Sequence, residues 1–323
     1  MILTVTPNPM LDKTLHLEQF PHGQISRTDR VLNVAGGKGI NVSRQLIYPG
    51  VESVATGFLG GRIGEIINAL LEKEGIKRDF VQVEDTTRIG FTVLETSTGV
   101  QTSVFEPGHR VTQSEAKQLQ GKVIGMLQRS PKGDRSVEWL VCSGTVPCEG
   151  MEDFYVAILR AARETGIPVV LDTYGAPLSL GVGERPFLVK PNVKEYVETF
   201  GSETGVETAD WGERAAIAAL ARLRGFGATA AVITDGENPA YASYGEHIWR
   251  VTPSRFRCVN ATGSGDAFIA GLLYGLTKSW DCESALRFAV ASGAANARRW
   301  EVACSSMAEI LSVASDVRME QLR

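Results

Sequence analysis

The chain has 323 residues, of which 43% are hydrophobic, and its formal net charge at pH 7 is -4. This length and apolar content are enough for a large buried core. The weak negative charge argues against a nucleic-acid partner, which would need a basic surface. The five cysteines are scattered without a CxxC pair, so the sequence indicates neither a zinc site nor a disulfide framework.

The sequence gives no sign of a targeting or membrane segment. Its start, MILTVTPNP, lacks the basic region and the long apolar core of a signal peptide. No run of about 18 apolar residues occurs, so we expect no membrane partner. We therefore expect a cytoplasmic protein whose cysteines are reduced thiols.

The first third of the chain contains mainly strand patterns. Residues 2–6 are a continuous apolar run typical of a buried strand, and Pro7-Asn8-Pro9 ends it. Further strand patterns lie at residues 13–18, 30–34, 51–58, 80–83, 89–95 and 102–105, and a helix at 63–71. Except for residues 51–58, we expect these strands to form a small separate sheet, placed as a lid over a site. Arg88 opens one of the lid strands, where it could bind an anion, although a solvated surface arginine is the alternative.

A glycine-rich helix start occupies residues 35–42, with the sequence AGGKGINV. It is neither a P-loop nor a dinucleotide-binding motif, since the spacing of its glycines fits neither pattern. Its glycines could let a sugar approach the backbone, and Asn41 offers both a donor and an acceptor. A plain strand-to-helix turn remains the alternative.

From residue 112 the pattern changes to alternating helices and strands, which is typical of a parallel sheet with helices on both faces. Helices are expected at 114–128, 151–164, 195–200, 212–223, 282–298 and 307–314, and strands at 137–142, 167–171, 187–189, 228–233, 241–244 and 248–251. Polar stretches follow several of the strands, at 143–145, 172–173, 190–192 and 234–236. Because ligands bind beyond the carboxyl ends of such strands, these stretches indicate one shared active edge.

The stretch Asn260–Phe268, NATGSGDAF, combines three features of an anion site. Gly263 and Gly265 allow a tight turn with outward-pointing amides. A helical pattern follows, and its N-terminus favours a bound phosphate. Asp266 lies in the first turn, where its carboxylate can accept a proton from an attacking hydroxyl. A plain helix N-cap with flexible glycines is the alternative.

Together these motifs resemble those of the ribokinase-like (PfkB) carbohydrate kinases over nearly the whole chain. Within that family the chain most resembles the branch of 1-phosphofructokinases and tagatose-6-phosphate kinases. The motifs that carry the resemblance are TPNPMLD (6–12), GGKGINV (36–42), SGTVP (143–147), VKPN with Glu195 (189–195) and NATGSGD (260–266).

The resemblance implies an α/β fold, a three-layer sandwich with a mostly parallel central sheet and a small β-sheet lid. Residues 1–323 would form a single domain, with the lid built from about 12–35 and 86–106. The lid carries an apolar outer face, so we expect a homodimer joined through the lids, as relatives often form.

The resemblance also assigns roles to individual residues. Asp266 would be the catalytic base, and the amides of Gly263, Ser264 and Gly265 would form the anion hole for the transferred phosphoryl group. The sugar phosphate would be held by Asp12, Gly36, Gly37, Lys38, Asn41, Arg88 and Ser143, with Arg88 on its phosphate. ATP would be bound by Lys190, Asn192, Glu195, Thr234, Gly236, Gly263, Gly265 and Asn296, with Asn296 near the adenine.

The implied reaction is the ATP-dependent phosphorylation of a ketohexose phosphate, with fructose 1-phosphate giving fructose 1,6-bisphosphate as the first choice. Tagatose 6-phosphate or fructose 6-phosphate is the alternative acceptor. Mg²⁺ would be required, and Glu195 would hold it through water, unless Glu195 is an ordinary first-turn acid. Relatives often bind K⁺ through backbone carbonyls near the central loop, a feature that leaves little trace in a sequence.

Two other classes of function remain open at this point. One is a kinase of the same fold for a nucleoside or an unphosphorylated sugar, which the cations Arg88 and Lys38 argue against. The other is a non-catalytic sugar-phosphate sensor, which the intact Asp266 argues against.

The sequence also departs from the family motifs at several positions. Ala261 replaces a proline, and Ser264 replaces an alanine, so that its hydroxyl could cap the helix or contact a phosphate. Asp235 and Glu237 make the element around Thr234 unusually acidic. Their carboxylates would have to point away from the ATP phosphates or help with magnesium.

Overall fold

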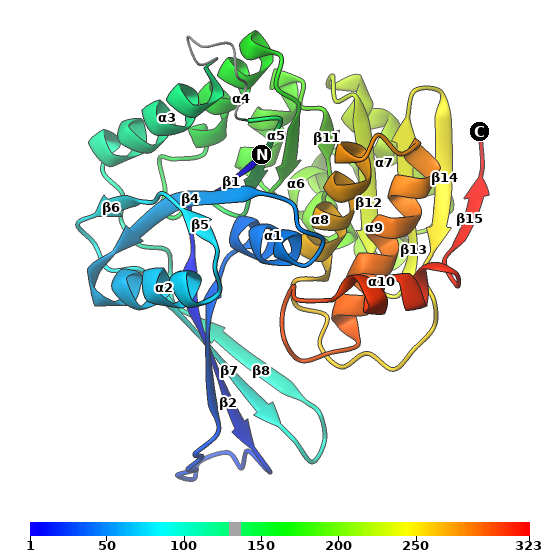
Figure 1. The fold of residues 1–323 in the computed structure, drawn as a ribbon. Helices are drawn as coiled ribbons and strands as arrows, with labels where there is room; N and C mark the ends of the chain where they lie inside the picture. Colours follow the sequence, from blue (N-terminus) through cyan, green and yellow to red (C-terminus); the bar gives the residue numbers. More distant parts are fainter. Residues whose placement is uncertain (129–136) are drawn as a thin grey trace.

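The computed structural model describes residues 1–128 and 137–323. Its main feature is an eleven-stranded sheet (Figure 1). The strands of this large sheet are β1 (Ile2–Thr6), β4 (Ser53–Gly60), β5 (Lys77–Arg78), β6 (Val81–Val83), β9 (Trp139–Ser143), β10 (Val169–Asp172), β11 (Leu188–Val189), β12 (Ala230–Asp235), β13 (Asn238–Tyr244), β14 (His247–Thr252) and β15 (Arg318–Gln321). Their order is β15-β14-β13-β12-β11-β10-β9-β1-β4-β5, with β6 paired to β4. The pairs from β12 to β5 are parallel, and β13 to β15 add an antiparallel edge.

Helices cover both faces of the large sheet. They are α1 (Lys38–Ile47), α2 (Gly61–Lys73), α3 (Gln113–Leu127), α4 (Phe154–Thr165), α5 (Ala176–Gly181), α6 (Val193–Thr204), α7 (Glu213–Gly225), α8 (Ser264–Thr277), α9 (Cys282–Ala297) and α10 (Met307–Ala314), with short 3₁₀ turns at Val182–Glu184 and Thr208–Asp210. Helices α1, α8, α9 and α10 pack on one face, and α3, α4, α6 and α7 on the other. Among the described helices, none is both long enough and apolar enough to cross a membrane.

The central strands are apolar on both faces because each face is covered. In β1, Leu3 and Val5 join the core under α3 and α4, whereas Ile2 joins the core under α1 and α8. Continuous apolar strands of this kind are typical of parallel sheets enclosed by helices. The predicted three-layer α/β architecture with a mostly parallel sheet is confirmed.

A second, four-stranded sheet stands off from the main body (Figure 1). It consists of β2 (Met10–Leu17), β3 (Val31–Gly36), β7 (Ile89–Glu95) and β8 (Gln101–Phe105), in the order β3-β2-β7-β8. The predicted small sheet is therefore present, but the assignment of residues 80–83 to it is wrong. Strand β6 instead runs parallel to the end of β4, where Val81 and Val83 join the core of the main body.

Candidate active site

Three helix N-termini meet beyond the carboxyl ends of the parallel strands. The Lys38 ammonium at the start of α1 lies 2.6 Å from Oε1 of Glu195 in the first turn of α6. One turn further along α1, the Asn41 amide lies 2.8 Å from Asp266 in the first turn of α8. Helix N-termini attract anions, because their free N–H groups and dipoles are both positive. This edge is therefore suited to phosphate groups, as the polar strand ends predict.

The glycine loop before α8 has the tight geometry that its sequence suggests. Gly263 is the N-cap residue and has a left-handed backbone, with φ 78°. A Cβ atom at Gly263 would lie 2.3 Å from Cγ1 of Val302, so a side chain would not fit. A Cβ at Gly265 would lie 3.2 Å from the Lys190 ammonium, so the backbone of α8 begins close to that cation. The glycine loop and the Lys190 ammonium therefore lie next to each other.

Asp266 is placed to act as a base. Its side chain is buried, and Asn41 Nδ2 donates a hydrogen bond to Oδ2, which leaves Oδ1 for an incoming hydroxyl. Burial, and then the nearby Asp172 carboxylate, raise the pKa of Asp266 to about 7, against the opposing effects of Lys38, Asn41 and Lys190. A base whose pKa lies near the working pH is ionised in a large fraction of the molecules and still binds a proton well.

A buried charge network connects the predicted sugar and nucleotide sides. Asp172, at the end of β10, lies 3.3 Å from the Lys38 ammonium and 3.2 Å from the Lys190 ammonium. Burial raises the pKa of Asp172, but the Lys190 and Lys38 charges outweigh it and hold the pKa below its ordinary value. Burial lowers the pKa of Lys38, but Asp172, Glu195 and Asp266 together hold it above its ordinary value. Asp172 and Lys38 therefore both stay charged and stabilise each other.

Asp172 is a site residue that sequence reasoning missed, since residues 172–173 were predicted only to be a polar strand end. The available signal was a carboxylate directly after a buried strand at the active edge. Its two lysine partners could not be inferred, since Lys38 is 134 residues away along the chain. The Lys38 ammonium also donates to Glu195 on the predicted nucleotide side, and its contact with the sugar phosphate stays a prediction.

Within residues 1–128 and 137–323, several buried polar atoms without hydrogen-bond partners lie on the predicted sugar side. They are Asn8 Oδ1, Asp12 Oδ1, Arg88 Nε and Ser143 Oγ. Arg88 donates to the Asn8 carbonyl oxygen at 3.2 Å, and its own carbonyl accepts from Leu11 N, next to Asp12. Buried polar groups are rarely left without hydrogen bonds, so these atoms suit a polar ligand.

Arg88 is half-buried rather than a solvated surface residue, and burial lowers its pKa. A charged group that is partly removed from water gains more from an anionic partner than an exposed one does. Gly36 ends β3 and Gly37 is the N-cap residue of α1, so this glycine pair lies between the small sheet and the helix that carries Asn41.

The start of α6 forms part of the predicted nucleotide side. Asn192 Oδ1 accepts from Glu195 N, and Glu195 Oε2 accepts from Asn192 N, both at 2.9 Å, which makes a capping box. Thr234 pairs with Asn192 through a parallel bridge, and Gly236 follows in an exposed turn. Glu195 therefore serves both as a first-turn acid and as the partner of Lys38.

Asn296 holds the loop before α8 in place. Its Nδ2 donates to the Thr262 carbonyl at 2.8 Å and to Ser264 Oγ at 3.0 Å, and its Oδ1 accepts from Ala303 N. Both Nδ2 hydrogens are therefore used within the protein, whereas Oδ1 accepts only one hydrogen bond and keeps a second acceptor site. The position of Asn296 near the adenine stays a prediction. The Ser264 hydroxyl accepts a hydrogen bond from Asn296 and does not cap the helix.

Asp235 is also engaged within the protein. Its Oδ2 accepts a hydrogen bond from Asn238 Nδ2 at 3.1 Å, and the neighbouring Glu237 is exposed. The Asp235 carboxylate is thus held by its own hairpin.

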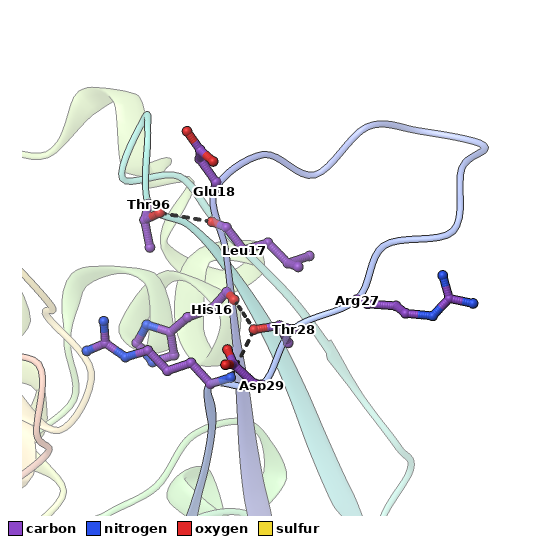
Figure 2. A pocket seen from close by; sticks show the side chains of 8 residues that line it. His16, Leu17, Glu18, Arg27, Thr28, Asp29 and Thr96 are labelled. Carbon is purple, nitrogen blue, oxygen red and sulfur yellow. Dashed lines mark hydrogen bonds between the residues drawn. The ribbon is translucent and has the colours of Figure 1, made fainter.

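A separate hollow of about 600 Å³ lies at the outer end of the small sheet (Figure 2). It is lined by His16, Leu17, Glu18, Arg27, Thr28, Asp29, Arg30 and Thr96. Thr28 and Thr96 are tied to the backbone carbonyls of His16 and Leu17, as Figure 2 shows. None of these residues belongs to the predicted site, so this hollow is not the place where those residues meet.

Comparisons with known proteins agree with this geometry. The family model described as pfkB family carbohydrate kinase matches residues 8–306. The chain is 33% identical over 299 residues to 1-phosphofructokinase of Bacillus subtilis, and 30% identical over 299 residues to tagatose-6-phosphate kinase of Staphylococcus epidermidis, with 92% of both chains covered in each case. The crystal structure of phosphofructokinase-2 from Escherichia coli in complex with potassium is similar at a TM-score of 0.87 and 25% identity, with 98% of each chain covered. The chain belongs to the pfkB family of carbohydrate kinases, and it is a phosphotransferase that acts on an alcohol group.

Proposed function

We propose that this protein transfers the γ-phosphoryl group of ATP to fructose 1-phosphate and forms fructose 1,6-bisphosphate. The observation that carries the proposal is the buried Asp266, whose free carboxylate oxygen lies at a helix N-terminus. Nearby, Asn8, Asp12, Arg88 and Ser143 have buried polar atoms that suit a sugar phosphate. The 1-phosphofructokinase similarity supports the choice of substrate.

In the proposed mechanism, Arg88 binds the phosphate that the substrate already carries. Asp266 Oδ1 accepts the proton of the acceptor hydroxyl as its oxygen attacks the γ-phosphorus, and the bond from that phosphorus to the leaving ADP oxygen breaks. The amides of Gly263, Ser264 and Gly265 stabilise the charge on the phosphoryl oxygens, which is usually the largest contribution in such reactions. Lys38 and Lys190 add positive charge on the same side.

Tagatose 6-phosphate and fructose 6-phosphate are the alternative acceptors. Furanose fructose is nearly symmetric end to end, so each of these substrates places a phosphate at one end of the ring and a primary alcohol at the other. The same Arg88 and Asp266 could serve each of them. The preference would then rest on one or two contacts, worth about 1–3 kcal/mol. The similarity to a tagatose-6-phosphate kinase favours keeping this alternative.

A coupled assay for ADP release, with the three sugar phosphates compared by kcat/KM, tests this proposal. We expect fructose 1-phosphate to give the highest value. If it is the poorest of the three, the choice within this group is wrong. If only an unphosphorylated sugar or a nucleoside is turned over, or none at all, the proposed function fails.

Activity should depend on Mg²⁺ or Mn²⁺. When bound, the cation neutralises the ATP phosphates, and the side chain that fits it here is Glu195, which is nearly buried beside Lys38. In the described ranges no three His, Cys, Asp or Glu side chains form a ready metal cage, so Glu195 would act through water and together with the phosphates.

Excess EDTA should abolish turnover and added Mg²⁺ should restore it, whereas unchanged activity in EDTA would contradict this role. The same assay with K⁺ replaced by Na⁺ tests for a monovalent-cation requirement, which the similarity to a potassium-bound structure motivates.

We further propose that residues 1–323 act as one domain whose small sheet is the lid of the site. Asp12, Thr14 and His16 alternate along one face of β2, and the His16 ring lies 6.2 Å from the Trp300 ring of the main body. That face therefore looks toward the site. A lid that closes there would exclude water and limit wasteful hydrolysis of ATP.

The opposite face of the lid supports the proposed homodimer. By the strand register, Leu15, Val31, Phe91, Val93 and Val104 share this face, and Val104 is 68% exposed. Exposed apolar patches of this kind mark association surfaces.

Light scattering at micromolar concentration should give twice the chain mass of 34.9 kDa. Val104→Glu should shift the protein to monomer, because it would bury a charge in the interface. The matched control is Ile66→Glu, at an exposed apolar position on α2, which should leave the dimer intact. A monomeric wild-type protein would count against the proposal.

A further inference from the structure

Arg44 lies directly behind the pair formed by Asn41 and Asp266. It is 6% exposed and donates to three partners. Nη1 donates to Asn41 Oδ1 at 2.6 Å, and Nη2 donates to the Ala35 carbonyl at 2.7 Å. Nε and Nη2 donate to the two carboxylate oxygens of Glu74, at 2.5 and 3.3 Å. This buried guanidinium therefore connects α1, the end of β3 and the end of α2.

The bond to Asn41 determines which way its amide faces. An amide can turn by 180° and exchange its donor and acceptor ends. Arginine has donors only, so it accepts one orientation, with Oδ1 toward Arg44. Nδ2 must then face Asp266, where it donates at 2.8 Å. In the reverse orientation Asn41 would present an oxygen to the carboxylate and repel it.

We propose that Arg44 is a positioning residue for the catalytic base, acting through the Asn41 amide. Glu74 holds Arg44, Arg44 orients Asn41, and Asn41 fixes the Asp266 carboxylate with its other oxygen free for the acceptor hydroxyl. The third partner of Arg44, Ala35, is the penultimate residue of β3, which enters α1 from the lid. The same guanidinium thus fixes the base relative to the lid strand.

The inference rests on the proposed function, and the chain offers a matched control for it. Arg78 also bonds an asparagine and a glutamate on α2, through Nε to Asn68 Oδ1 at 2.6 Å and Nη2 to Glu72 at 3.2 Å. Its partners are exposed, and Asn68 contacts no predicted site residue in the described hydrogen bonds. A loss that Arg44→Met shows and Arg78→Met lacks is therefore not a general effect of removing an arginine that packs against α2.

The test is a double-mutant cycle on steady-state kinetics. Arg44→Met should lower kcat by about tenfold, with KM for ATP changed by less than about twofold, and Arg44→Lys should recover only part of the loss because one ammonium cannot hold all three partners. In an Asn41→Ala background, Arg44→Met should cause less than about a further twofold loss, since the group it orients is gone. Arg78→Met should leave kcat within about twofold of wild type. The proposal would be overturned if the kcat loss of the double variant equals the product of the two single-variant losses. An unchanged kcat in Arg44→Met would also overturn it.

Two further measurements keep the result decisive. If Arg44→Met does not fold, Glu74→Gln, which weakens the hold on Arg44, should lower kcat in the same direction by about threefold, and an unchanged kcat there would overturn the proposal. The second measurement needs no enzyme activity: the ¹⁵N NMR signals of the Asn41 side-chain amide report how that amide is oriented. These signals are identified because they are missing from the spectrum of Asn41→Ala. They should shift in Arg44→Met but not in Arg78→Met, and signals that do not move would overturn the proposal. An inactive wild-type protein would defeat the proposed function alone.

Discussion

Replacing Asp266 with asparagine is expected to lower kcat by at least about 10²-fold, which is the usual contribution of a general base. The substitution keeps the size of the side chain and removes its ability to accept the hydroxyl proton. Fold and nucleotide binding should persist, because the buried carboxylate is not the group that anchors the loop; Asn296 does that. The measurements are steady-state kinetics, ATP binding by calorimetry, and thermal unfolding. A kcat within about threefold of wild type would show that Asp266 is not the base.

The pH dependence of the wild-type enzyme gives an independent check on the same residue. A carboxyl group acts as a base only when ionised, and burial followed by Asp172 raises the pKa of Asp266 to about 7. Below that pH the protonated fraction of Asp266 grows, so kcat/KM should decrease with falling pH, by a factor that approaches ten for each pH unit. A kcat/KM profile that stays flat down to pH 5 would contradict this assignment. The profile of kcat reports the enzyme–substrate complex instead, where bound phosphates and magnesium also act on Asp266.

Arg88→Ala should have the second-largest effect. A hydrogen bond between a guanidinium and a phosphate is worth roughly 1.5–3 kcal/mol, which corresponds to a loss of about 10–150-fold in kcat/KM for the sugar phosphate. Within residues 1–128 and 137–323, Lys38 pairs with Asp172 and Glu195, so we expect Arg88 rather than Lys38 to bind the substrate phosphate. KM for ATP should stay nearly constant. Arg78→Ala is the control for the loss of an arginine side chain.

A loss of less than about fivefold in Arg88→Ala would remove the phosphate-binding role. If the loss is the same for fructose 1-phosphate and for unphosphorylated fructose, Arg88 supports the lid rather than the substrate phosphate. In that outcome the phosphate would have to be sought elsewhere among the residues of the small sheet.

The sequence predicted the architecture because its patterns are local. Continuous apolar strands followed by amphipathic helices indicate a covered parallel sheet, and the structure has one. The same reasoning failed for Val81–Val83, because a three-residue strand pattern does not contain its pairing partner. Packing of Val81 and Val83 against the main core places that strand beside β4.

The candidate site could be predicted where one motif carries both the chemistry and its backbone. Asp266 and the glycines before it are such a case. The role of Glu195 could be read only in part, since a first-turn acid and an ion-pair partner of Lys38 look the same in sequence. Asp172 and Arg44 were missed as site residues because their importance comes from partners on other elements. The sequence could not show that the Asn296 amide also bonds within the protein, and its place near the adenine stays a prediction.

The most direct test of the central claim is to identify the product. Wild-type protein incubated with fructose 1-phosphate, ATP and Mg²⁺, and followed by ³¹P and ¹³C NMR, should form fructose 1,6-bisphosphate and ADP in equal amounts, and Asp266→Asn should form neither at a comparable rate. Release of inorganic phosphate without a new sugar phosphate, or no consumption of ATP with any of the three ketohexose phosphates, would contradict the account.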